Sequence, residues 1–231
     1  MSITVENRLP RDDLALGVVR VEGVAVGPAP AALAEELGRV VALRAAQPLS
    51  PEEEALRRAS RDMLRNGRYR PTGRGKPASE YLVRAACRDD FPRINGPVDA
   101  NNLVSLLHCV PVSVWDLDLA GTGRFELRLG GDERYVFNAS GQDLDLRDLV
   151  CGCGLLDGGE SRPMVTPIKD CLATKVVDGT ARVAGAVYYP LGCGRARLEQ
   201  ATSNLLRWLE ACGSRAEGAM AICLPGETVT L

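Results

Sequence analysis

The chain has 231 residues, enough to bury a full hydrophobic core in one large domain or in a domain with an N-terminal extension. Apolar residues make up 45% and charged residues 25%, which excludes an intrinsically disordered chain. The formal net charge of −2 is too small to indicate any partner, so an electrostatic argument depends on where the charges lie along the chain.

The first residues, MSITVENRLPRDD, are polar and lack the apolar stretch of a signal peptide. No segment has the length and hydropathy of a transmembrane span, so we expect a cytoplasmic protein without a membrane partner. In that compartment the eight cysteines are expected to be thiols. Three of them lie in apolar contexts and are predicted to be core residues: Cys87, Cys109 and Cys212.

A zinc site is the one metal centre that the cysteines suggest. Cys151 and Cys153 form a CxC pair, and Cys171 and Cys193 would complete a four-thiolate set. The gaps between these cysteines match no common zinc-ribbon spacing. The sequence therefore predicts neither a metal nor another cofactor.

The N-terminal part of the chain predicts a strand followed by two helices. Residues 14–26 are rich in valine and alternate partly, as in a strand. Residues 31–46 carry helix formers with helical apolar spacing. The next helix begins with Ser50 at the N-cap, Pro51 at the first helical position and Glu53 as the return arm of a capping box.

Residues 57–77 hold eight basic side chains against the single acid Asp62. The second half of this run is rich in Gly and Pro and predicts a loop, which a helix over residues 78–87 follows. Clustered arginines release counterions from phosphates and so bind RNA, although a solvated helix face would look the same. The RNA-binding candidates, among them a tyrosine able to stack on an unpaired base and one lysine from a later segment, are Arg61, Arg65, Arg68, Tyr69, Arg70, Arg74, Lys76 and Lys169.

A run of polar side chains precedes a helix predicted over residues 101–107. These side chains either cap and turn the backbone around that helix or face a pocket that binds a polar ligand. The following strand, residues 110–118, ends in two aspartates that would bind an ammonium group or tie off the strand end. The ligand-binding candidates are Arg93, Asn95, Asp99, Asn102, Asp116 and Asp118.

The second half of the chain predicts mostly strands. A turn at Gly130-Gly131-Asp132 joins two alternating segments, which predicts a hairpin of residues 124–129 with residues 134–137. Further strands are expected within residues 145–156 and 181–189. A last helix spans residues 197–212. Strands outnumber β-α-β alternations, so the predicted fold class is α+β, a mixed β-sheet flanked by helices.

With these elements in order, the chain resembles the B3/B4 domain, the editing module of the bacterial phenylalanyl-tRNA synthetase β chain, and its free-standing relatives. The residues that carry the resemblance are Arg93-Ile94-Asn95, Val98-Asp99, Asn102, Pro111 and Trp115-Asp116. The resemblance covers about residues 60 to 215 and is most specific in this first block. It implies a B3/B4-type fold and the hydrolysis of an amino acid wrongly attached to tRNA, an activity of translation quality control.

Two functional side chains of that family do not carry over directly. Ser113 stands at the position of the family's histidine, and the single histidine of the chain, His108, lies five residues earlier. Ser113 could orient a water molecule or simply pack in a strand. A Gly-Gly-Glu turn ending at Glu160 matches the family's glutamate only with a gap, and would supply a general base. Thr174 and Lys175 resemble a Thr-Lys pair of the free-standing relatives, near the tRNA 3′ end.

The sequence thus predicts two parts: an N-terminal extension over residues 1–55, with a strand and a helix packed on the main domain, and a B3/B4-like domain over residues 56–231. The expected function is that of a free-standing aminoacyl-tRNA editing factor, an ester hydrolase. The vicinal hydroxyl of the terminal ribose of the tRNA can assist the reaction. Its expected partner is tRNA, bound through the acceptor arm and the 3′ end. The alternative is a module of the same fold that binds tRNA or an amino acid without turnover. The oligomeric state is not predicted.

Overall fold

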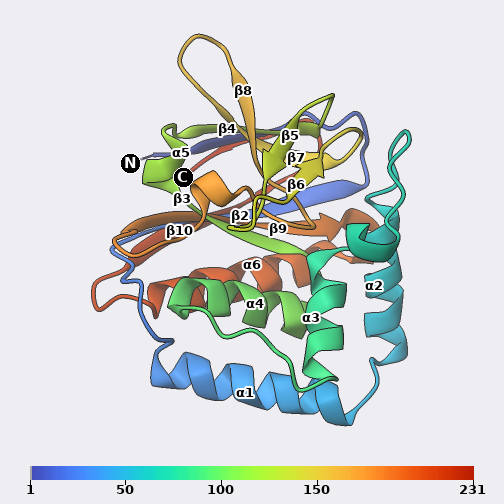
Figure 1. The fold of residues 1–231 in the computed structure, drawn as a ribbon, viewed down its shortest axis with the longest axis vertical. Helices are drawn as coiled ribbons and strands as arrows, with labels where there is room; N and C mark the ends of the chain where they lie inside the picture. Colours follow the sequence, from blue (N-terminus) through green and yellow to red (C-terminus); the bar gives the residue numbers. More distant parts are fainter. Residues whose placement is uncertain (1) are drawn as a thin grey trace.

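The computed structural model describes residues 2–231 and shows two β-sheets stacked above a layer of helices (Figure 1). The first sheet has five strands in the order β11-β1-β4-β7-β8. Their bounds are β1 (Thr4–Asn7), β4 (Arg124–Leu129), β7 (Val150–Leu155), β8 (Ser161–Val165) and β11 (Thr228–Thr230). Strands β1 and β4 are parallel and the other pairs are antiparallel, so this sheet is mixed.

The second sheet is antiparallel, with four strands in the order β10-β2-β9-β3. Its strands are β2 (Leu14–Glu22), β3 (Val112–Asp116), β9 (Arg182–Pro190) and β10 (Glu217–Cys223). Side chains on one face of β2, including Leu16 and Val18, pack against the five-stranded sheet. Side chains on the opposite face, including Val19 and Val21, pack against helices. This sheet is therefore covered on both faces, which explains why β9 is buried along nearly its whole length.

The helical layer consists of α3 (Ala78–Ala86), α4 (Gly96–His108) and α6 (Arg195–Glu210), with α1 (Ala31–Ala46) outside it (Figure 1). Helix α6 lies against β2, where a Cβ added to Gly17 would come within 1.8 Å of Thr202 Oγ1. Glycine at this position therefore lets the helix approach the sheet closely. Helix α2 (Pro51–Asp62) stands at the side of these layers, and the short α5 (Leu117–Ala120) follows β3.

The mixed five-stranded sheet, the antiparallel sheet and the flanking helices confirm the predicted α+β class, with two stacked sheets where the sequence predicted one. Residues 2–55 contain the predicted strand, as β2, and the predicted helix, α1. They also supply β1, which the sequence did not predict. Because β2 lies between β10 and β9, and β1 between β11 and β4, this part of the chain contributes to both sheets. The division at residue 55 stays a prediction.

The predicted hairpin of residues 124–129 with residues 134–137 is wrong. Strand β4 pairs with β1 and β7, whereas β5 (Arg134–Val136) pairs with β6 (Asp143–Asp145) in a separate two-stranded ribbon. The turn at Gly130 does not fold the chain back on itself, because Gly130 forms a bridge to Arg147 instead. The alternating pattern identified the strands but not their partners.

The cysteines are free thiols, as predicted. Cys109 and Cys212 are buried core residues, but Cys87 is exposed at the end of α3, so its predicted place in the core is wrong. Within residues 2–231, no helix combines the length and the apolar character needed to span a membrane.

Candidate functional site

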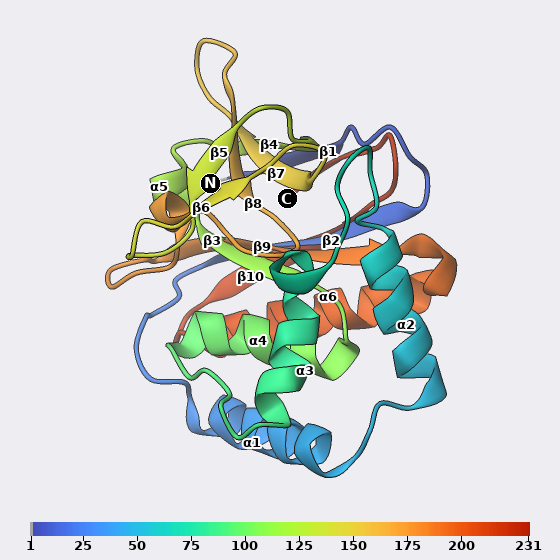
Figure 2. The ribbon, with the colours of Figure 1, turned by 45° about the vertical axis from the view of Figure 1, so that its right-hand side comes forward.

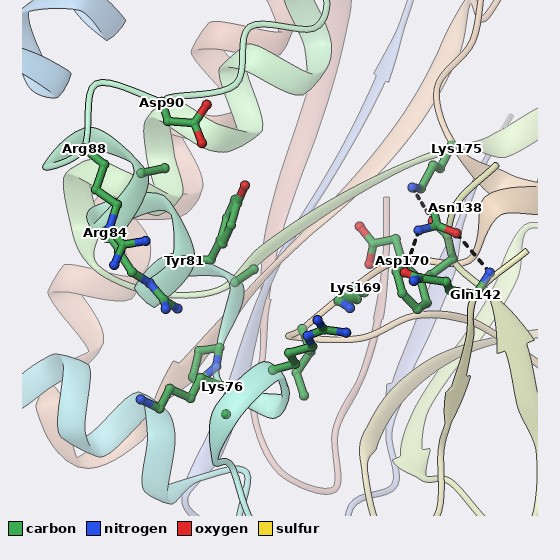
Figure 3. Close-up of a pocket in the computed structure, with 17 residues that line it drawn as sticks. Lys76, Tyr81, Arg84, Arg88, Asp90, Asn138, Gln142, Lys169, Asp170 and Lys175 are labelled. Atoms are coloured by element: carbon green, nitrogen blue, oxygen red, sulfur yellow. Dashed lines mark hydrogen bonds between the residues drawn. The ribbon is translucent and has the colours of Figure 1, made fainter. Parts of the chain in front are cut away.

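A cleft of about 990 Å³ separates helix α3 and the loop before it from the β5–β6 ribbon and residues 168–175 (Figure 3). Figure 2 shows the loop after α2 rising beside the sheets before the chain turns down into α3. This path brings the second half of the basic run to the mouth of the cleft. The polar side chains that line the cleft are Arg74, Lys76, Tyr81, Arg84, Arg88, Asp90, Asn138, Gln142, Lys169, Asp170 and Lys175.

Six of these side chains are cationic, and none of the six forms an ion pair with a carboxylate within residues 2–231. Burial, together with the charges of Arg74 and Lys175, lowers the pKa of Lys169, which shows that the cations repel one another. Lys169 Nζ lies 3.8 Å from the centre of the Phe137 ring. Lys175 Nζ donates a hydrogen bond of 2.6 Å to the Phe137 carbonyl oxygen. Six cations against two carboxylates, Asp90 and Asp170, leave an excess of positive charge, which is typical of a site that binds an anion.

Asp170 is one of the two carboxylates that line this cleft, and it lies on the wall opposite α3. Burial raises its pKa to about 7, against the opposing effects of a hydrogen bond from Ser113, the Thr166 backbone and the charge of Lys175. Asp170 Oδ1 accepts from Ser113 Oγ at 2.8 Å and from the Thr166 N–H at 3.2 Å. A carboxyl group whose pKa lies near neutrality can exchange a proton with a ligand at physiological pH.

Ser113 lies behind Asp170 and does not line the cleft. Its side chain is fully buried in β3, and the Tyr188 hydroxyl lies 3.4 Å from its Oγ. A water molecule in the cleft meets Asp170 first, because Asp170 covers the serine. Ser113 is therefore not placed to contact a water molecule in the cleft, as the sequence had suggested. It holds the Asp170 carboxylate in position instead.

The first half of the basic run serves the fold. Arg57 and Arg61 both bind the buried carboxylate of Glu80 on α3, which ties α2 to α3. Arg65 pairs with Asp62 on the surface. These arginines lie outside the cleft, and their charge is largely neutralised by the neighbouring acids.

The second half of the run divides between loop and cleft. Arg74 and Lys76 line the cleft. Arg68 is exposed outside it, and Arg70 donates to the Gly67 and Tyr69 carbonyl oxygens. The predicted stacking residue Tyr69 is mostly buried, and its hydroxyl donates a 2.7 Å hydrogen bond to the Gly75 carbonyl oxygen. Tyr69 therefore stabilises the loop and does not present its ring to a ligand.

Most of the polar run before α4 caps backbone groups. Asn95 is the N-cap of α4 and accepts from the Val98 N–H at 3.0 Å. Asp99 accepts from the Ile94 N–H at 2.9 Å, and burial raises its pKa. Arg93 is exposed, with its guanidinium over the Phe91 ring. Asn102 differs from these, because it lines a second hollow of about 290 Å³ beside the cleft.

The two aspartates after β3 have structural partners. Asp116 caps α5 by accepting from the Asp118 and Leu119 N–H groups, and it also accepts from the Thr180 hydroxyl. Asp118 forms an exposed ion pair with Arg182. Neither aspartate lines the cleft, so neither is placed to bind an ammonium group there.

The remaining predicted residues are scattered. Lys169 and Lys175 line the cleft, whereas Thr174 is buried outside it, with no hydrogen-bond partner for its Oγ1. Glu160 is exposed at the loop between β7 and β8 and is not among the cleft residues. Nor does His108 reach the cleft, since its Nε2 lies 2.9 Å from Asn204 Nδ2 of α6.

Sequence reasoning missed the α3 wall of the cleft and the importance of Asp170. Tyr81, Arg84 and Arg88 follow one another at spacings of three and four residues. That spacing places them on one face of a helix, so the pattern was present but was not used. Asp170 gave no signal of its own, because its raised pKa depends on segments far apart in the sequence.

The sequence matches no known family model, and no curated protein is significantly similar to it. Among residues 2–231, no group of three or more histidine, cysteine or acidic side chains has the arrangement of a metal site. The chemistry of the site therefore has to be argued from the cleft residues themselves.

Proposed function

We propose that this protein binds the 3′ end of tRNA in the basic cleft and hydrolyses the ester that joins an amino acid to it. The observation that carries this proposal is the combination of six unpaired cations with one carboxyl group whose pKa is about 7. A polyanion satisfies the cations, and a general base poised near neutrality suits ester hydrolysis.

The resemblance to the B3/B4 editing module supports the same function. Its most specific block, from Arg93 to Asp116, forms α4 and β3, which bring Ser113 against Asp170. The α+β arrangement with mixed sheets is compatible with a B3/B4-type fold. The family histidine is replaced by Ser113, and in this proposal Asp170 takes over the proton transfer.

The reaction needs little apparatus because an aminoacyl ester is already activated. A water molecule attacks the ester carbonyl carbon, and Asp170 accepts a proton from it. The bond from the carbonyl carbon to the ribose oxygen then breaks, and the ribose oxygen takes up a proton. Lys169 and Lys175 stabilise the negative charge that develops on the carbonyl oxygen. The products are a free amino acid and uncharged tRNA.

A second candidate is a module of the same kind that binds tRNA without turnover. It is favoured by one observation: no histidine or cysteine is among the residues that line the cleft. Catalysis would then depend on Asp170 alone, and a cleft without a working base would still hold RNA through its cations.

Purified protein incubated with a panel of mischarged tRNAs tests the proposal. We expect at least one amino acid to be released faster than in buffer. Asp170→Asn should lower that rate by about 100-fold or more, because the general base is lost. The matched control, Asp157→Asn, changes a fully exposed aspartate on the β7–β8 loop and should leave the rate unchanged.

Two results would separate the candidates. Release of no amino acid from any tRNA, with tight binding of uncharged tRNA, would favour the binding module. Equal rates for the wild type and Asp170→Asn would show that hydrolysis does not use this cleft in the way proposed.

A further inference from the structure

An apolar groove of about 290 Å³ adjoins the basic cleft, and Ala78 and Tyr81 line both. Its walls come from the start of α3, the segment before α4, and α4 itself. The apolar residues that complete it are Leu82, Pro92, Ile94, Val98 and Val112. The groove contains no charged side chain, so it suits a neutral, largely apolar group attached to something that the cations bind.

Tyr81 is unlike the other tyrosines of the chain. The hydroxyls of Tyr69, Tyr135, Tyr188 and Tyr189 each form a hydrogen bond within the protein. Tyr81 is 56% exposed, and its hydroxyl has no hydrogen-bond partner within residues 2–231. Figure 3 shows its ring projecting into the open space between the two walls of the cleft. An exposed aromatic ring without a structural role is available for stacking.

Two amides lie at the inner end of the groove. Asn101 and Asn102 are about nine-tenths buried, with exposed fractions of 9% and 8%. Their one hydrogen bond joins Asn101 Nδ2 to Asn102 Oδ1 at 3.3 Å. Asn101 Oδ1 is left without a partner, and Asn102 Nδ2 forms no hydrogen bond within residues 2–231. Asn101 Oδ1 is inaccessible, so the pair presents one unused donor to the groove, Asn102 Nδ2, which suits an acceptor on the edge of a nucleobase.

We propose that this groove binds the terminal nucleobase of the RNA, with the base stacked on Tyr81 and its edge at Asn102. The inference rests on the proposed function, because that function supplies the RNA ligand. The site itself is an addition, since the proposed hydrolysis does not require it. Arg84 lies on α3 one turn after Tyr81, and Arg88 follows in the turn that ends the helix, so phosphates bound there hold a base close to the ring. Aromatic rings interleaved with cations are the usual means of binding single-stranded nucleic acid.

An amino-acid side chain is the competing occupant, and the position of Asp170 decides between the two. Cations line both walls of the cleft, with Lys169 and Lys175 beside Asp170 and Arg84 beside Tyr81. In the proposed reaction the ester carbon lies beside Asp170. The nucleotide is then left to the opposite wall, where Tyr81 and Arg84 bind it.

Binding of adenosine monophosphate and of ribose 5-phosphate, measured by calorimetry at one salt concentration, tests the site. The two probes differ only in the base. Since stacking on an aromatic ring accounts for about five- to 140-fold in affinity per base, we expect the nucleotide to bind at least five-fold more tightly. Tyr81→Ala should abolish this difference, whereas Tyr81→Phe should keep most of it. Leu119→Ala, at an exposed apolar residue of α5, is the matched control and should change nothing.

Equal affinities of the wild type for the two probes would overturn the inference, as would a difference that persists in Tyr81→Ala. Circular dichroism confirms that each variant is folded, which is expected because Tyr81 is exposed. The outcome is separate from that of the hydrolysis assay. A preference for the nucleotide that depends on Tyr81, in a protein that releases no amino acid, would leave the nucleobase site standing and remove the proposed activity.

Discussion

Asp170 links the chemistry of the cleft to the stability of the fold. Its pKa rises from 3.8 to about 7 because the folded protein buries it. Between these values the folded protein keeps a proton that the unfolded chain has lost, so the free energy of unfolding falls as the pH rises from about 4 to about 7. Above pH 7 the folded protein contains an ionised, largely desolvated carboxylate.

Asp170→Asn should therefore stabilise the protein at high pH. At pH 8 we expect a gain of several kcal/mol in the free energy of unfolding, with roughly 4 kcal/mol as the upper limit set by the pKa change. The gain should shrink to near zero at about pH 3, below the ordinary pKa of 3.8, where the wild-type carboxyl is mostly protonated in both states. Urea unfolding at a series of pH values measures it. A gain that does not vary with pH would show that the pKa of Asp170 is not raised.

Tyr69 gives a second prediction at this scale. Its hydroxyl donates to the Gly75 carbonyl oxygen inside the loop that leads to the cleft. Tyr69→Phe should lower the free energy of unfolding by about 1 kcal/mol, the net value of one such hydrogen bond. RNA affinity should change little, because the ring is not presented to the ligand. A large loss of RNA affinity with unchanged stability would restore the stacking role that the sequence predicted.

Single residues differ in how well the sequence predicts them. The cap at Ser50 was predictable because its partners lie within three residues, and the capping box is present. Arg74, Lys76 and Lys169 were found through their charge, and Lys175 through the resemblance to the Thr-Lys pair of the free-standing relatives. Asp170 was not, because its environment is made by Ser113, Thr166 and Lys175, which only the folded chain brings together.

At the scale of elements, one buried carboxylate connects the two helices beside the cleft. Glu80 of α3 binds Arg57 and Arg61 of α2 and has a side-chain exposure of 7%. This bridge fixes the start of α3, and so the position of Tyr81, relative to α2. The arginines of the basic run were predicted to bind RNA, but two of them are committed to this contact.

Glu80→Gln should be costly because it removes the buried counter-charge shared by Arg57 and Arg61, and Arg61 is left without its partner while Arg57 keeps Glu54. We expect the free energy of unfolding to fall by about 3 kcal/mol. The matched control, Glu52→Gln, removes an exposed partner of Arg197 and should cost less than about 1 kcal/mol. Urea unfolding of both variants measures the difference, and equal losses would contradict the structural role of Glu80.

The elements also show where pattern reasoning stops. The strands at 124–129 and 134–137 were located from their alternation, yet their pairing as a hairpin was wrong. Pairing depends on which edges remain free in the folded sheet: β4 pairs with β1, which is distant in sequence, and with β7, whereas β5 pairs with the nearby β6. Short edge strands such as β11, with three residues, leave too little sequence for a pattern.

The whole molecule carries its function in the distribution of charge, since the net charge is only −2. Six cations gather at one cleft against two carboxylates, Asp90 and Asp170, while many of the other acids form ion pairs elsewhere on the surface. The sequence located the basic run but could not separate its structural half from its cleft half. In the folded chain, Arg57 and Arg61 of α2 bind Glu80 of α3, whereas Arg74 and Lys76 in the loop between these helices line the cleft.

Binding of a single-stranded RNA 3′ end should therefore weaken with salt. Each phosphate contact adds about −0.7 to the slope of log affinity against log salt. Arg84→Gln, in the cleft, should weaken binding and make the slope less steep by about that amount. Arg58→Gln, at an exposed arginine of α2 outside the cleft, should leave the slope unchanged. Equal effects of the two variants would show that total charge, not the cleft, determines affinity.

The dependence of hydrolysis on pH tests the central claim most directly. Under single-turnover conditions, we predict that release of an amino acid from its mischarged tRNA accelerates about tenfold per pH unit below pH 7 and levels off above it, as Asp170 becomes ionised. Asp170→Asn should be slow at every pH and lack this inflection. If Asp170→Asn showed the same inflection near pH 7 as the wild type, the account would be contradicted.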